Sequence, residues 1–124
     1  MPTSTFFVSG DPTKARATVD QLLAERGFSL SYSDAFTGTA ERGSKAGTVA
    51  FGALAGSSNQ HLKVNLNFAS DPYGNTAITI AAATTGAAAG LIGVNRAKKA
   101  YGELFAAIRA TFAQAGVLLG EQAI

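Results

Sequence analysis

Hydrophobic and polar residues alternate along several stretches of the chain, a pattern that predicts β-strands with one buried and one exposed face. The alternation is clearest over residues 62–68, where Leu, Val, Leu and Phe occupy every second position and Lys and Asn lie between them. Shorter stretches that alternate, or are rich in aromatic and β-branched residues, predict four more strands over residues 5–9, 28–33, 36–41 and 76–82.

Apolar residues at three- and four-residue spacing predict a helix after the first strand. Asp11 is placed to cap this helix, Pro12 suits its first position, and Gly27 supplies its end. On the polar side of the helix, Arg16 and Asp20 are expected to face mainly solvent.

The same spacing predicts a second, longer helix from about residue 96 to residue 115. Asn95 is placed to cap it and Gly116 to end it. Residues 117–119 are apolar and are expected to continue the packing, and residues 121–124 are expected to form a loose end.

The predicted order is therefore β-α-β-β-β-β-α in a single α+β domain over residues 1–124. Consecutive strands are expected to pair antiparallel, and both helices are expected to cover one face of the sheet. This order resembles the TATA-binding-protein-like and helix-grip folds, in which a long C-terminal helix crosses a curved antiparallel sheet. The resemblance lies in topology and is carried by no motif, so it bears on the fold and only weakly on function.

Composition narrows the classes of function. The absence of Cys excludes thiol chemistry, disulfides and thiolate zinc sites. A net charge of +2 with 15% charged residues is too small for a generic polyanion binder, so nucleic acid is not an expected partner. Residues 1–11 lack the features of a signal peptide, which predicts a cytoplasmic protein. Residues 72–95 carry no formal charge, but their strand-like first half and Gly-broken second half do not favour a membrane span.

Two Gly-rich apolar segments stand out, over residues 44–59 and 84–94. The first carries Phe51 and Leu54, and it is either a core-packing helix or strand or an exposed element that offers these two side chains to a ligand or subunit. The second is expected to be a bent loop or frayed turn, because each Gly costs a helix about 1 kcal/mol. Its Leu91 and Ile92 are either buried or in contact with a lipid, a membrane or a partner.

Basic residues follow the second segment. Gly93 precedes Arg96, Lys98 and Lys99, which are expected in the first turn of the last helix. Cations at that end oppose the helix dipole, so the pattern indicates either an anion-binding helix N-terminus or a solvated basic turn.

The outward positions of the predicted strands form a polar and almost uncharged set. Such a face suits either packing on another copy of the sheet or a lightly decorated solvent surface, and it lacks the Arg and aromatic residues of an RNA-binding sheet. These positions are Ser29, Ser31, Ser33, Thr37, Thr39, Lys63, Asn65, Asn67 and Thr79.

No arrangement of residues indicates catalysis, a metal site or a cofactor. His61 is the single histidine, and the eight acidic residues are scattered. A cofactor-independent enzyme with an apolar cavity stays open as an alternative, without residues to assign to it.

The leading hypothesis is a non-enzymatic binding module for an amphiphile, such as a fatty acid, or for an anionic membrane surface. Phe51, Leu54, Leu91 and Ile92 would contact the apolar part, and the basic residues near Gly93 would contact the anionic head. The alternative is a protein that self-associates through the Gly-rich segments and the polar sheet face, as a homo-oligomer without a small ligand.

Overall fold

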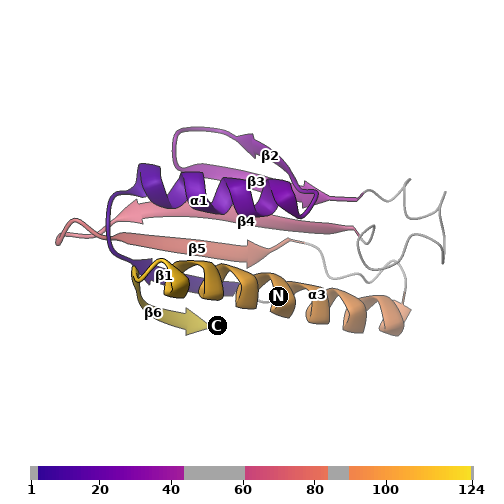
Figure 1. The fold of residues 1–124 in the computed structure, drawn as a ribbon. Helices are drawn as coiled ribbons and strands as arrows, with labels where there is room; N and C mark the ends of the chain where they lie inside the picture. The colour runs from indigo at the N-terminus through magenta and orange to yellow at the C-terminus, as the bar shows by residue number, and fades with distance from the viewer. Residues whose placement is uncertain (1–2, 44–60, 84–89, 124) are drawn as a thin grey trace.

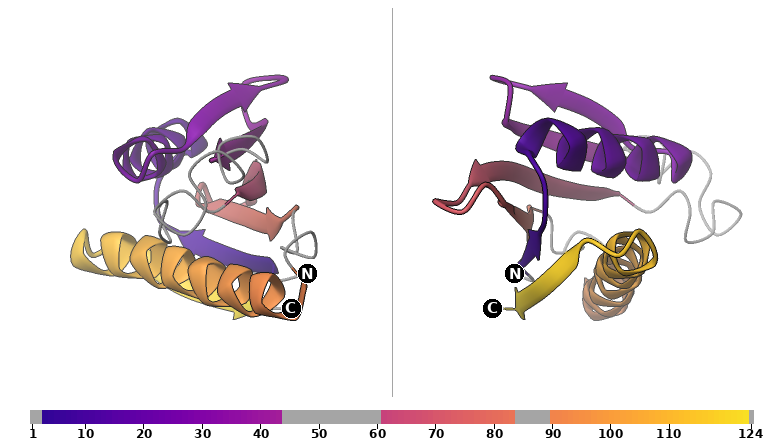
Figure 2. Two further views of the ribbon diagram at one scale, coloured as in Figure 1. Left: turned by 90° about the vertical axis from the view of Figure 1, so that its right-hand side faces the viewer. Right: turned by 60° about the vertical axis from the view of Figure 1, so that its left-hand side comes forward.

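The computed structural model describes residues 3–43, 61–83 and 90–123, with residues 90–94 described by their backbone. The elements run in the order β1 (Thr3–Val8), α1 (Pro12–Glu25), β2 (Ser29–Tyr32), β3 (Thr37–Arg42), β4 (Leu62–Ser70), β5 (Thr76–Ala82), α3 (Gly90–Gln114) and β6 (Leu118–Ala123). The strands form one antiparallel sheet of order β2-β3-β4-β5-β1-β6. Both helices lie on the same face of this sheet (Figures 1 and 2). The predicted α+β architecture is thus confirmed.

The core lies between this face and the two helices. Alternate residues of β4 and β5 are buried, as the periodicity predicts. The helices contribute the other half of the core, and the ring of Phe105 from α3 meets that of Phe6 from β1 edge to face, with centroids 6.4 Å apart. The fully buried apolar side chains include Leu23, Leu62, Leu66, Ile78, Ile80, Tyr101 and Ile108.

The first helix begins and ends where its capping residues predict. The Asp11 carboxylate accepts a hydrogen bond from the Lys14 backbone N–H at 3.0 Å, and Pro12 occupies the first turn. At the other end Gly27 adopts φ +87°, the left-handed conformation that only Gly adopts without strain.

The predicted start of the last helix is wrong. Helix α3 begins at Gly90, six residues before Arg96, so the segment expected to be a bent loop is helical from that point. Buried side chains further along, such as Ala97 and Tyr101, anchor the helix on the sheet. Once a helix is anchored, each added turn gains backbone hydrogen bonds without a new nucleation cost, which offsets the penalty of Gly90 and Gly93.

The expected loose C-terminal end is also wrong, because residues 118–123 form a sixth strand, β6, beside β1. Its sequence lacks clear alternation and contains Gly120, so its local propensity is low. Contacts with β1 and α3 form it instead. The Glu121 carboxylate accepts two hydrogen bonds from the Arg109 guanidinium of α3 and one, at 2.9 Å, from the Ser4 hydroxyl of β1.

Candidate functional site

The second face of the sheet carries the candidate site, because no helix or strand among the described residues covers it (Figure 2). The strand register arranges its side chains in rows that cross the sheet. One central row contains Ser31, Thr39, Asn65, Ala81 and Thr3. The next contains Thr37, Asn67, Thr79, Thr5 and Gln122. We call this surface the open face.

Short side chains leave a hollow in the open face. The hollow has a volume of about 400 Å³ and is lined by β2 to β5, with Thr39, Asn65 and Thr79 among its polar residues. Hydroxyl and amide groups both donate and accept hydrogen bonds, and Thr5 and Thr79 pair in this way at 3.2 Å. The strand residues predicted to face outward all lie on this face, and Ser33 lines its hollow.

The two ends of the open face differ in chemistry. At one end Glu41 and Lys63 are register partners, and His61 hydrogen-bonds to the Glu41 carboxylate. This bond lowers the pKa of Glu41. At the other end a row of Ala69, Ala77, Phe7 and Gly120 is apolar, and the Phe7 ring is 37% exposed. Among the residues that the structure describes, the charges of the face are therefore confined to one end, where Glu41 and Lys63 carry opposite charges.

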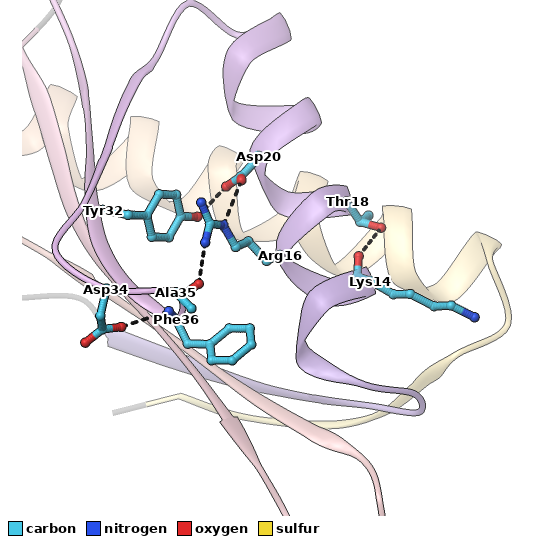
Figure 3. Close-up of polar contacts among 8 residues, drawn as sticks. All are labelled: Lys14, Arg16, Thr18, Asp20, Tyr32, Asp34, Ala35 and Phe36. Atoms are coloured by element: carbon cyan, nitrogen blue, oxygen red, sulfur yellow. Dashed lines mark hydrogen bonds and ion pairs between the residues drawn. The ribbon is translucent and has the colours of Figure 1, made fainter.

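A polar cluster beneath the open face holds β2 against α1 (Figure 3). The Arg16 guanidinium lies 3.6 Å from the centroid of the Tyr32 ring and pairs with the Asp20 carboxylate at 3.3 Å. The Tyr32 hydroxyl donates to Asp20, and Arg16 donates to the carbonyl oxygen of Ala35. Burial and the bond to Asp20 raise the pKa of Tyr32. Arg16 and Asp20, expected to face mainly solvent, instead fix the strand that borders the hollow.

A smaller hollow of about 190 Å³ lies where α1, β3 and α3 meet. The Arg42 guanidinium lies 5.1 Å from the centroid of the Phe28 ring and donates to the Arg26 carbonyl oxygen at 3.4 Å. Burial lowers the pKa of Arg42, and the nearby charge of Arg26 lowers it further. Arg42 thus fastens the end of α1 to the sheet, which is a structural role.

The structure does not describe the side chains of the residues predicted to contact the apolar part of an amphiphile. Phe51 and Leu54 lie outside the described residues, and for Leu91, Ile92 and Gly93 the structure describes the helical backbone alone.

The structure places the three cations predicted to bind an anion. Their expected position in the first turn of the last helix is wrong. Arg96, Lys98 and Lys99 are exposed on α3, but they lie after its first turn. The unpaired N–H groups of a helix belong to its first four residues, so these cations do not flank such groups. They form an exposed basic stretch on the helix surface.

Within the described residues, no group of three or more acidic or His side chains is placed to hold a metal ion. No described helix has the length and hydropathy needed to cross a membrane. Comparison with protein families, curated proteins and solved structures found no match to this chain. The chemistry of the open face therefore carries the functional argument.

Proposed function

We propose that the chain is a non-enzymatic interaction protein that self-associates through its open face. The observation that carries this proposal is the combination of a sheet face that no described helix or strand covers with two central rows that contain no charged residue. An ordinary solvent-facing sheet carries more Lys and Glu, which keep it soluble and apart from its neighbours.

Charge favours a second copy as the occupant. In a two-fold contact the same surface patch lies on both partners, so a charged patch would meet its own charge. Burying an unpaired charge is costly, whereas neutral hydroxyl and amide groups can pair with their own kind. The central Ser, Thr and Asn residues of the open face are such groups.

Side-chain size favours the same occupant. Two sheets that pack face to face lie about 10 Å apart, with their side chains interdigitated. The open face offers short side chains around a hollow of about 400 Å³, and among the described strand residues Phe7 is its single large apolar side chain. Side chains of the partner sheet can enter this hollow without displacing bulky groups.

The test is a charge placed in the centre of the open face. Asn65 is exposed and lines the hollow, so Asn65→Lys should leave the fold intact and bury an unpaired positive charge of each copy in the contact. Sedimentation velocity should show the wild type associating at micromolar to millimolar concentration and the variant shifting to lower mass. Gln114→Lys on α3 makes the same charge change on the helix side and should leave association unchanged. A wild type that stays monomeric throughout contradicts the proposal.

Binding of an amphiphile or anionic membrane surface is the second candidate function, supported by the exposed Arg96, Lys98 and Lys99 along one stretch of α3. On this proposal Lys98→Glu should weaken binding to vesicles that contain anionic phospholipid and leave the oligomeric mass unchanged. Native mass spectrometry separates the two candidates, because a retained amphiphile adds a few hundred daltons to the protomer whereas self-association multiplies the chain mass. Equal vesicle binding by the wild type and Lys98→Glu would contradict this second candidate.

A further inference from the structure

Among the described strands, β6 lies at an edge of the sheet and pairs with β1 on one side. Edge strands present unpaired N–H and C=O groups, and natural proteins protect them with Lys, Pro, bulges or short length. Residues 118–123 contain no Lys, Arg or Pro. The register shift between Phe7 and Val8 affects the start of β6, and residues 120–123 then pair regularly with Phe7 to Ser4.

The one charge of β6 does not protect this edge. The Glu121 carboxylate is held by Arg109 and Ser4 on the helix-covered side of the sheet, and these hydrogen bonds lower its pKa. The opposite edge, β2, is four residues long, as long as the regularly paired part of β6, and is tied to α1 through Tyr32. Beyond the bulge, residues 120–123 of β6 therefore carry no charge that protects the β6 edge.

Exposed apolar side chains gather at the β6 edge. Among the described residues, three large hydrophobic side chains are exposed, and two of them are Phe7, at 37%, and Leu119, at 59%. Phe7 lies in β1 beside Gly120, and Leu119 lies in β6 itself. An extended segment added along β6 would cover Leu119 and complete the backbone pairing.

Symmetry indicates which segment this is. Two copies related by a two-fold axis bring identical surfaces together, so the edge strand of one copy meets the same strand of the other in antiparallel orientation. Two copies joined in this way would unite their six-stranded sheets into one sheet of twelve strands and double the open face.

We infer that β6 pairs antiparallel with β6 of a second copy, which joins two sheets into one continuous sheet. The inference rests on the proposed function, because the doubled open face is the surface on which another such pair packs. Strand β6 itself has the chemistry that its edge requires: it is extended, its carboxylate is already paired, and it carries the apolar Leu119. The smallest complete assembly then has four copies, with one interface along the edge and another across the open face.

The experiment is native mass spectrometry with sedimentation velocity on the full chain and three variants. Leu119→Lys adds a protective charge to the edge at an exposed position, where it should not disturb folding. Tyr73→Lys is the matched control, because Tyr73 is 87% exposed in the turn between β4 and β5, away from this edge. Asn65→Lys places a charge in the centre of the open face and should disrupt pairing across it.

The wild type and Tyr73→Lys should give four times the chain mass of 12.6 kDa, and Leu119→Lys and Asn65→Lys should each give at most twice that mass. A Leu119→Lys variant with the mass of the wild type would overturn the edge pairing. If Asn65→Lys alone lowers the mass, the face contact stands and the edge inference fails. If Leu119→Lys alone lowers it, the edge pairing stands and the proposed function fails.

Amide hydrogen exchange gives a second readout that does not depend on a variant. Edge pairing covers backbone N–H groups of β6 that point away from β1, so their exchange should slow at least tenfold between dilute and concentrated wild-type protein. Pairing across the open face leaves those groups uncovered. Exchange in residues 118–123 that is independent of concentration would overturn the inference even if the protein self-associates.

Discussion

Gly38 shows how a single residue fixes the strands that border the hollow. A Cβ at this position would lie 2.6 Å from the Ser31 carbonyl oxygen and 2.7 Å from Cδ1 of Tyr32. Real Cβ atoms do not approach other atoms so closely, and the Ser31 oxygen belongs to the neighbouring strand. Gly38 is therefore required so that the Tyr32 ring can lie over β3 while its hydroxyl reaches Asp20.

Gly38→Ala should lower the free energy of unfolding by about 1–3 kcal/mol, since the added methyl group must displace backbone as well as the Tyr32 ring. Urea denaturation measures this change. The matched control is Gly102→Ala in α3, where a Cβ meets nothing within 4 Å. This substitution should stabilise the protein by about 0.5–1 kcal/mol, because Ala lowers the conformational entropy of the unfolded chain. Equal effects of the two substitutions would show that the close approach at Gly38 does not matter.

Strand β6 forms through contacts with neighbouring elements rather than through the local propensity of its own sequence. The alternation of residues 62–68 predicts β4 correctly because one face of that strand is buried along its whole length. Residues 118–123 have no such pattern, and their pairing depends on Arg109 twelve residues earlier and Ser4 at the other end of the chain. The early start of α3 at Gly90 has the same cause, since tertiary anchoring outweighs local propensity.

The ion pair between Arg109 of α3 and Glu121 of β6 predicts a specific pH dependence of stability. The hydrogen bonds from Arg109 hold the pKa of Glu121 below its ordinary value of 4.5. A lowered pKa in the folded state means that the stabilisation is present above about pH 4.5 and is lost as the pH falls through the folded pKa. Glu121→Gln should therefore reduce stability at pH 7 by about 0.5–1 kcal/mol and flatten its decline in acid.

Urea denaturation from pH 7 to pH 3 measures both effects of Glu121→Gln. Glu25→Gln is the control, because Glu25 lies on the exposed surface of α1 and bonds to Gln21 of the same helix. This control should keep the acid profile of the wild type. If the stability of Glu121→Gln declined in acid as steeply as that of the wild type, a contribution of the Arg109–Glu121 ion pair to stability would be excluded.

For the molecule as a whole, the sequence predicts the layers and the two faces of the sheet. It does not predict the hollow or the contacts that hold the strands around it. Alternation assigns Asn65 and Thr79 to the outward face without knowledge of any partner, because the side chains of a strand point to opposite sides. The hollow depends on which residues lie side by side across strands. That register is set by pairings such as Thr39 with Asn65, between residues distant in the chain. The position of Arg16 over Tyr32 depends on packing in the same way.

Self-association also predicts how thermal stability depends on protein concentration. Association stabilises the folded state and not the unfolded state, so a hundredfold rise in concentration stabilises a dimer by about 2.7 kcal/mol, or about 1.4 kcal/mol per chain. For a chain of 124 residues this corresponds to an increase in Tm of roughly 5 °C. Differential scanning calorimetry at two concentrations measures the shift, which Asn65→Lys should reduce and Gln114→Lys should retain. A wild-type Tm that is independent of concentration would mean that folding of the chain is complete without a partner copy, and the almost uncharged open face would then be a lightly decorated solvent surface.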